Sequence, residues 1–277
     1  MASPKAGIGK PDLATLLGLV IAIGAILGGL LIEGGKVGDI LQFTAGMIVM
    51  GGTLGAVMVA TPLKVLIGAA KRMLGVFFDP SAPFGVLIDE LVGYASKARK
   101  SGLVGLEEEA QASTDPFLQK ALMLAVDGTD LQELRNMLEI DMTLHEHHGE
   151  AEAKVFEAAG GFAPTIGIIG AVLGLIQVMK NLANIDEVGH GIAVSFVATV
   201  YGVGAANLLF LPAAAKIKAR LHLESHRKEM ILEAVCGIIE GLNPKIIRAK
   251  LEAYALGESS KSQAKGEKAA AEAPAEA

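Results

Sequence analysis

The sequence predicts an all-α fold: an integral membrane protein with four transmembrane helices, a large helical cytoplasmic loop and a helical cytoplasmic C-terminal segment. Three observations support this prediction. Hydrophobic residues make up 52% of the 277-residue chain, and its mean hydropathy of +0.48 is high for a soluble protein of this length. Four stretches without a charged residue are long enough to cross a bilayer core of about 30 Å. Lysine and arginine are concentrated on one side of the predicted membrane.

The predicted spans come in two pairs, each joined by a short polar hairpin, "EGGKVGD" or "KNLANIDEVGH". The first apolar run is longer than the core of a signal peptide, which has about 7–15 residues, and no clear cleavage site follows it, so we interpret it as a retained span. The predicted segments are an N-terminal transmembrane pair at 1–63 (spans 13–32 and 40–63), a cytoplasmic helical domain at 64–160, a C-terminal transmembrane pair at 161–215 (spans 161–179 and 191–215), cytoplasmic C-terminal helices at 216–256 and a disordered tail at 257–277.

The orientation of the spans follows from the distribution of basic residues. Of the 24 lysine and arginine residues, only Lys36 and Lys180 fall on the side of the two hairpins. Because positive charge is retained in the cytoplasm, both termini and the large loop are predicted to be cytoplasmic, and the hairpins to face outward.

Composition also excludes several classes of function. A net charge of −6 argues against a nucleic-acid partner, and the single cysteine, Cys236, permits no intrachain disulfide and is expected to be buried. The cluster "HEHHGE" (His145, His147 and His148) resembles a set of metal ligands, but its spacing does not place all three imidazoles on one helical face, so we interpret it as a solvated helix end. We find no soluble enzyme domain, and predict no enzymatic activity and no cofactor.

The spans themselves hold no Asp, Glu, Lys, Arg or His. Proton-coupled carriers generally need an ionisable group inside the membrane. Either this chain moves no ions, or a partner helix contributes the carboxylate. Small-xxx-small spacings, such as Gly170–Gly174, allow a partner helix to approach closely, but they serve equally well for packing among the chain's own spans.

Three polar or kinked positions in the later spans have two interpretations each. Pro164 and Pro212 lie near the cytoplasmic ends of spans three and four, where each marks either a helix boundary or a hinge beside a pore. Thr199 lies in the middle of span four, with Ser195 one turn earlier on the same face. Its hydroxyl bonds either to a carbonyl of its own helix or to a partner's carboxylate.

In the loop, the charge run "SKARKSGLVGLEEEA" is either a solvated face or a protein-docking surface.

These motifs together resemble the MotA/PomA family, the A subunits of the bacterial flagellar stator. The resemblance covers roughly residues 13–254 and includes "DLATLLGLV", "SKARKSGLVGLEEE", "LAVDGTD", "FAPTIGIIGAVLGLI", "GHGIAVSFVATVYG" and "EGLNPKIIRAKLEAY". Spans three and four alone would also suit the related ExbB/TolQ energy transducers. The first two spans and the charged loop favour the stator. A non-conducting membrane scaffold is a further alternative.

The resemblance implies a partner, a target and a location. Family stators contain five A subunits around two MotB/PomB-type B subunits, and the B-subunit helix carries the aspartate that binds the permeating ion. The complex lies in the bacterial inner membrane and drives the rotor protein FliG. By resemblance, Thr199 faces that aspartate, Pro164 and Pro212 are the two functional prolines, and Arg99 and Glu107 are the charged pair that engages FliG.

The resemblance also bears on the transported ion. Ala171 lies where sodium-type relatives carry threonine and proton-type relatives carry alanine, and Ala198 departs from the Thr-Thr pair of the sodium type. Both alanines lack a hydroxyl that would help to replace the hydration shell of a sodium ion. We therefore expect H⁺ rather than Na⁺, with Ala171, Ala198, Ser195 and Thr199 along the ion pathway.

Overall fold

The computed structural model describes residues 10–79 and 84–254, and most of these residues are helical, which confirms the all-α prediction. The predicted tail at 257–277 lies outside the described residues. Two segments that were not predicted, β1 (Lys10–Pro11) and β2 (Phe78–Asp79), form a short antiparallel pair. The helices are α1 (Leu13–Ile32), η1 (Val37–Ile40), α2 (Phe43–Gly46), η2 (Met47–Gly51), α3 (Gly52–Ala60), α4 (Leu63–Gly75), α5 (Phe84–Ser101), η3 (Leu103–Leu106), α6 (Glu107–Ala112), α7 (Pro116–Val126), α8 (Leu131–Lys180), α9 (Ile185–Gly204), η4 (Ala205–Phe210), α10 (Leu211–Ile239) and a last helix at 244–254.

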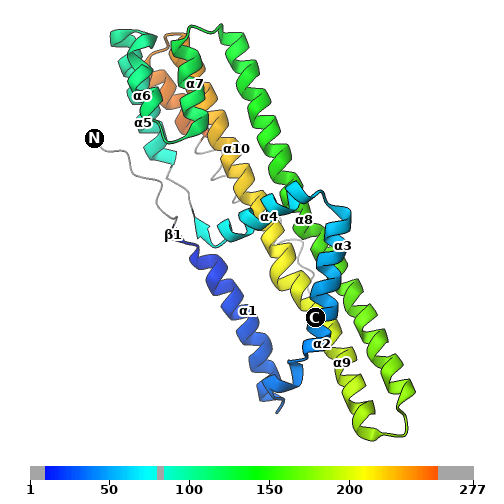
Figure 1. Ribbon diagram of the computed structural model, residues 1–277. Coiled ribbons are helices and arrows are strands. Elements are labelled where there is room, and N and C mark those ends of the chain that lie inside the picture. Colours follow the sequence, from blue (N-terminus) through cyan, green and yellow to red (C-terminus); the bar gives the residue numbers. More distant parts are fainter. Residues whose placement is uncertain (1–9, 80–83, 255–277) are drawn as a thin grey trace, which may run out of the picture. The chain divides into compact units, whose positions relative to one another are not determined.

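The described residues form two compact units. Residues 84–145 and 222–254 make one, which we call the loop-and-tail unit, and residues 10–79 and 146–221 make the other, the spanning unit. Helices α8 and α10 contribute residues to both (Figure 1). The segment boundaries predicted at 160/161 and 215/216 therefore fall inside helices, because the sequence there contains no helix stop that outweighs its helical periodicity. The division into five segments stays a prediction.

Within the described residues, four helices are long and apolar enough to cross a membrane, as predicted: Leu13–Ile32, Phe43–Ala60, Leu131–Lys180 and Ile185–Ile239. The first has the predicted bounds, because the Asp12 side chain caps it by accepting a hydrogen bond from the Thr15 amide at 3.2 Å. The second is shorter than predicted. Thr61 is extended, as expected for a residue that precedes a proline, and Pro62 is the N-cap residue of α4.

Two of the spans contain a π-helical turn, η2 in the second and η4 in the fourth. A π turn widens the helix by one residue and misaligns backbone hydrogen bonds, so it is rare and often found at functional sites. The sequence pattern gave no indication of either turn, because apolar periodicity does not distinguish a π turn from an α turn.

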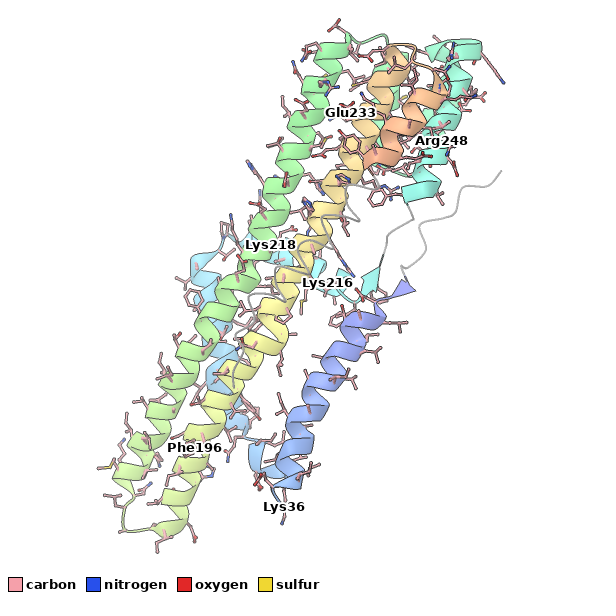
Figure 2. All side chains as sticks on the ribbon, turned by 180° about the vertical axis from the view of Figure 1, so that it is seen from behind. Lys36, Phe196, Lys216, Lys218, Glu233 and Arg248 are labelled. Carbon is pink, nitrogen blue, oxygen red and sulfur yellow. The ribbon has the colours of Figure 1, made fainter. Side chains whose placement is uncertain are left out.

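The core of the loop-and-tail unit is formed by α5, α7, the first turns of α8, the end of α10 and the last helix. Its fully buried side chains include Leu91, Leu122, Leu134 and Ile231, and Cys236 is also buried, as expected. Gly241, with φ at 70°, allows the chain to turn after α10, so that the last helix packs back on this core. The Glu233 carboxylate accepts hydrogen bonds from Arg135 at 3.0 Å and Lys250 at 2.8 Å on the flank of that core (Figure 2).

A charged junction holds the beginning of α1 in the spanning unit. The buried Asp12 carboxylate lies 2.5 Å from the Lys216 ammonium and 3.2 Å from the Arg220 guanidinium, both on α10. The Asp12 amide donates to the Phe77 carbonyl at 2.9 Å, and Arg220 donates to the Val76 carbonyl at the same distance. The junction therefore connects α1, α10 and the segment between α4 and β2.

Asp12→Asn is expected to lower the free energy of unfolding of the purified protein by roughly 1–3 kcal/mol, because two partly buried cations lose their carboxylate partner. The hydrogen bond from Lys216 lowers the pKa of Asp12 to about 2, against an ordinary value of 3.8. A carboxyl whose pKa is lowered on folding adds stability above its unfolded pKa and loses it as the pH falls through its folded pKa. The deficit of the variant should thus be constant between about pH 5 and 8 and shrink below about pH 4. A deficit that changes across neutral pH would contradict this assignment.

Candidate functional site

The residues predicted for an ion pathway lie on and beside the contact between α8 and α9 in the spanning unit. These two helices run antiparallel after a short turn (Figure 1). Ser195 on α9 is buried, and its hydroxyl lies 2.8 Å from the Ala171 carbonyl of α8 and 2.9 Å from the Gly191 carbonyl of its own helix. Ser195 therefore links the two helices, and its hydroxyl proton is already engaged.

Thr199 is half-buried, one turn along α9 from Ser195. Its hydroxyl donates to the Ser195 carbonyl at 3.2 Å, which is the local bond that a threonine commonly forms inside a membrane helix. Because a hydroxyl oxygen also carries two acceptor lone pairs, the group can still accept a hydrogen bond from a protonated carboxyl or a water molecule. Thr199 thus forms the local hydrogen bond, and its hydroxyl oxygen can still accept another.

Ala198 and Ala171 have different surroundings. Ala198 is fully buried against α8, so that a Cβ added at Gly170 would lie only 2.8 Å from the Ala198 Cβ. Ala171 is half-buried. The structure therefore places Ala198 inside the helix–helix contact, whereas Ala171 and Thr199 have part of their surface exposed in the single chain.

Glycines on both helices make this close contact possible. A Cβ at Gly174 would lie 2.7 Å from the Gly191 carbonyl oxygen, and a Cβ at Gly202 would lie 2.6 Å from the Ala163 carbonyl oxygen. At Gly167, the nearest atom to an added Cβ would be the Ala198 carbonyl oxygen, at 2.9 Å. Real Cβ atoms essentially never approach backbone atoms this closely, so the glycines set the distance between α8 and α9. The sequence indicated the Gly170–Gly174 spacing, but not which helix it contacts.

Pro164 lies inside α8, opposite Gly202 of α9. Its ring supplies no N–H to the Gly160 carbonyl one turn earlier. The neighbouring Thr165 hydroxyl donates to the Phe162 carbonyl at 2.8 Å. The helix continues through the proline, so Pro164 is not a helix boundary. It is a point in a packed helix where one backbone hydrogen bond is missing.

Pro212 follows the π turn η4, in the second residue of α10. The irregular turn accommodates a residue that lacks the donor of a regular helix. Pro212 is exposed and lines a cavity of about 380 Å³, together with Asn207, whose amide donates to the Val203 carbonyl at 3.0 Å. Asn207 was missed by our sequence analysis, although a side-chain amide in an otherwise apolar span was a usable signal.

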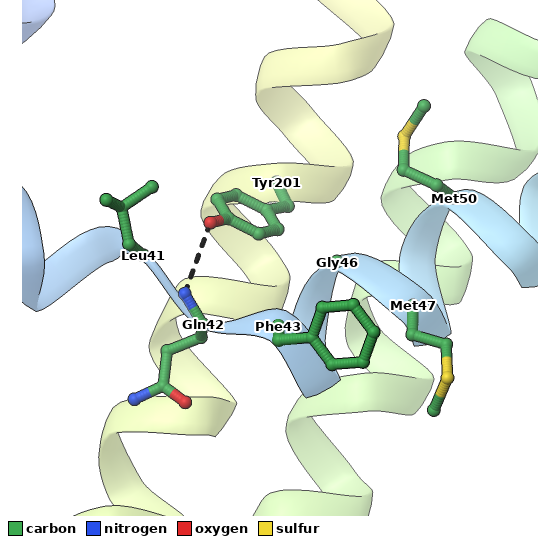
Figure 3. A pocket seen from close by; sticks show the side chains of 7 residues that line it. All are labelled: Leu41, Gln42, Phe43, Gly46, Met47, Met50 and Tyr201. Carbon is green, nitrogen blue, oxygen red and sulfur yellow. Dashed lines mark hydrogen bonds between the residues drawn. The ribbon is translucent and has the colours of Figure 1, made fainter.

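Tyr201 of α9 forms hydrogen bonds with the residues at the beginning of the second span. Its hydroxyl donates to the Ile40 carbonyl at 2.6 Å. It also accepts a hydrogen bond from the Gln42 backbone N–H at 3.3 Å (Figure 3). The ring borders a pocket of about 430 Å³ whose other walls are Leu41, Gln42, Phe43, Gly46, Met47 and Met50. Most of the lining is apolar, and the pocket lies at the opposite end of the spans from the charged junction.

Arg99 and Glu107 lie in the loop-and-tail unit. Arg99 is in the last turn of α5 and Glu107 is the first residue of α6, and both are exposed. Gly102, with φ at 76°, ends α5 and permits the turn between them. Lys97 and Glu109 form an ion pair that connects α5 to α6, and the hydrogen bond from Lys97 lowers the pKa of Glu109. The charge run is thus divided between a pair that joins the helices and residues that face outward.

The histidine cluster lies in the interior of α8, which corrects our expectation of a helix end. The helix continues past it because "HEHHGEAEAKVFEAA" keeps strong helix formers on both sides. His145 lies 3.2 Å from Glu224, while His147 and His148 are exposed. Among residues 10–79 and 84–254, no group of three or more possible metal ligands is found.

Comparisons with known proteins match nearly the whole chain. Residues 109–230 match the MotA/TolQ/ExbB proton channel family, and residues 16–93 match the N-terminal region of motility protein A. Motility protein A of Helicobacter pylori is 36% identical over 256 residues, which cover 92% of this chain and all of the relative.

Two solved structures are also similar. MotAB of C. jejuni superposes with a TM-score of 0.83 at 34% identity, covering 88% of this chain and 95% of the other. The flagellar MotAB stator complex of Bacillus subtilis superposes with a TM-score of 0.81 at 32% identity, covering 87% and 95%. The N-terminal match covers nearly all of the first two spans. These are the spans that favour a stator subunit over an energy transducer. The chain therefore belongs to the MotA/TolQ/ExbB proton channel family and, within it, to the motility protein A subunits of flagellar stators.

Proposed function

We propose that the chain conducts protons together with a MotB-type subunit, and that this flux generates torque on the flagellar rotor. The observation that carries the proposal is the absence of any Asp, Glu, Lys, Arg or His in the four apolar stretches at 13–32, 40–63, 161–179 and 191–215. A proton path across the membrane needs a titratable group, which a second subunit must then supply. The similarity to MotAB structures supports a B-type subunit as its source.

In this proposal Thr199 accepts a hydrogen bond from the protonated carboxyl of the B subunit. Its hydroxyl oxygen has the lone pairs for it, and its side chain is partly exposed. Ala171, also partly exposed, adds no oxygen ligand at the neighbouring position. A sodium ion needs several oxygen ligands in place of its water shell, so the scarcity of hydroxyls here supports protons as the coupling ion.

Pro164 and Pro212 act in this proposal as points where the helices deform. Each lacks a backbone donor, and Pro212 adjoins a π turn. Moving one charge through a potential of 100 mV releases about 2.3 kcal/mol, which is enough to shift a helix between nearly equivalent arrangements but not to separate a large interface. A ring of identical subunits provides such equivalent arrangements, and the family resemblance suggests five copies.

Arg99 and Glu107 are the proposed contacts to the rotor protein FliG. Both are exposed charges on ordered helices, Arg99 at the end of α5 and Glu107 at the beginning of α6. Exposed charges of this kind orient a partner without binding it tightly. The excess of basic residues outside the hairpins supports a location of this unit and of both termini in the cytoplasm, with the spans in the inner membrane.

Proton uptake into vesicles tests whether the B-type subunit supplies the titratable group that this chain lacks in its spans. The chain alone, the chain with a B-type subunit, and the chain with a B subunit whose membrane aspartate is changed to asparagine are reconstituted at equal density. We expect uptake only in the second preparation. Uptake by the chain alone would overturn the proposal, and equal, background uptake in all three would favour a non-conducting scaffold.

Thr199→Val is expected to slow motor rotation severalfold and to leave membrane insertion unchanged, because valine has nearly the same shape but accepts no hydrogen bond. Losing one local hydroxyl bond inside a helix has little effect on stability. Rotation of tethered cells measures the effect, with Thr165→Val as the matched control, since that hydroxyl also bonds locally, to Phe162. Equal rotation of the two variants would assign the Thr199 hydroxyl a structural role.

A further inference from the structure

The cavity beside Pro212 lies between α1, the end of α4 and the η4–α10 segment, all within the spanning unit. Its volume of about 380 Å³ is in the range of ligand pockets, about 300–1,000 Å³. On α1 its wall is formed by Ala14, Gly18 and Ala22, which succeed one another at intervals of about one helical turn, together with Thr15 and Leu19. No atom of residues 10–79 and 84–254 lies within 4 Å of a Cβ built at Gly18, so these residues leave space beside this wall.

Apolar groups line most of the cavity, and its polar lining side chains include Lys216, Asn207 and Thr15. Lys216 directly follows the last uncharged residue of the fourth span, and Ala14 is the second residue of the first span, so the cavity begins where both helices leave the apolar region (Figure 2). In a bilayer, this is the depth of lipid headgroups.

The charge at this end of the cavity is positive. One carboxylate, Asp12, faces two cations, Lys216 and Arg220. The Arg220 side chain is 17% exposed and donates to the backbone as well, whereas the Lys216 side chain is 34% exposed. An ammonium group has three donors, and a single carboxylate oxygen does not use all of them. Lys216 can therefore bind a second anion that reaches it from the cavity.

We propose that the cavity binds an anionic phospholipid, with an acyl chain along the small-residue face of α1 and its phosphate against the Lys216 ammonium. Three observations agree on this occupant: an apolar lining, a position next to the end of the spans, and a net positive charge at that end only. None of the residues of α1 is buried in the single chain, so lipid can reach this face. The proposal uses the four-span membrane topology and does not depend on ion conduction.

Photocrosslinking in reconstituted vesicles tests the proposal. The full-length protein is placed in phosphatidylcholine vesicles that contain a trace of photoactivatable phosphatidylglycerol or, in parallel, of the matching phosphatidylcholine, and crosslinked peptides are mapped by mass spectrometry. We expect crosslinks at residues 14–22 and 207–216, with phosphatidylglycerol preferred about fivefold, the preference expected for one basic residue at an anionic surface.

Three variants separate the cavity from ordinary lipid contact. Gly18→Leu fills the cavity and should remove these crosslinks, whereas Gly24→Leu, the same change on α1 outside the cavity and also without neighbours within 4 Å, should retain them. Lys216→Gln should make the crosslinking yields of the two lipids equal, and Asp12 keeps Arg220 as an ion-pair partner in this variant. Crosslinks that spread evenly over all apolar helices, that ignore Gly18→Leu or that show no lipid preference would overturn the proposal. Protein–protein crosslinks at 14–22 would also overturn it, because they would assign the cavity to a second copy of the chain.

Discussion

Gly202→Ala is expected to abolish motor rotation and to remove most of the folded protein from the membrane. The added methyl group would lie 2.6 Å from the Ala163 carbonyl oxygen, 3.1 Å from the Gly167 Cα and 3.2 Å from the Pro164 Cα. All three are backbone atoms, so no side-chain rotation relieves the contact, and α8 and α9 must separate. Overpacking a tight contact costs about 1–3 kcal/mol, and here the same shift displaces Thr199 relative to α8.

Gly204→Ala is the matched control, because a Cβ at Gly204 on the same helix meets no atom within 4 Å. Removing a glycine from a helix interior is otherwise favourable by about 0.5–1 kcal/mol, so this control should be as stable as the parent or slightly more so. Thermal unfolding in detergent and the rotation of tethered cells measure both variants. If Gly202→Ala unfolds at the same temperature as Gly204→Ala, the proposed close packing of α8 on α9 is wrong.

Charge reversal at the two residues proposed to contact the rotor, Arg99→Glu or Glu107→Arg, is expected to stop swimming almost completely while leaving proton uptake and thermal stability unchanged. Both side chains are exposed, and the spanning unit contains neither of them. A like-charge contact in an interface costs several kcal/mol, which is comparable with the energy that one proton delivers. Compensating reversals in FliG should restore swimming.

The neighbouring Lys97–Glu109 pair provides the comparison. Glu109→Gln removes the ion pair between α5 and α6, so we expect a lower unfolding temperature and no rescue by a change in FliG. Rescue of Arg99→Glu together with failure to rescue Glu109→Gln would separate partner contact from folding. Wild-type swimming in both single reversals would remove the rotor role assigned to Arg99 and Glu107.

The sequence predicted the number of membrane helices because uncharged apolar runs of about 20 residues seldom occur outside membrane spans. It located the first span to the residue, since Asp12 caps its beginning and a polar hairpin follows its end. It placed the beginning of the third span at residue 161 and the end of the fourth at residue 215, although both positions lie inside longer helices, α8 and α10. Hydropathy reports where apolar residues end, and a helix with good formers on both sides does not end there.

The candidate site was predictable in part. Thr199, Ser195 and the two prolines are conspicuous in apolar surroundings, and the Gly170–Gly174 spacing indicated close packing. What the sequence did not reveal depends on contacts between distant residues. The contact of Gly174 with Gly191, the ion pair between Asp12 and Lys216, and the hydrogen bond from Tyr201 to Ile40 all join separate elements, for which local periodicity carries no information.

The apolar periodicity of the sequence also did not predict the π turns. The π turn before Pro212 follows from how the helix accommodates the proline and its neighbours, and a run such as "AANLLF" reads equally well as α-helix. The lack of Asp, Glu, Lys, Arg and His in the four apolar stretches of the sequence, more than any single motif, supports the proposal of a channel whose titratable group comes from another chain.

Rotation of tethered cells tests the central claim most directly. The chain and a B-type subunit are expressed in a host that lacks its own stator, sodium is varied at constant pH, and a protonophore is then added. The account predicts rotation that is indifferent to sodium and stops with the protonophore. Rotation that follows the sodium concentration and survives the protonophore would contradict proton coupling, and no rotation with any compatible B subunit and rotor would contradict the proposed torque-generating role of the chain.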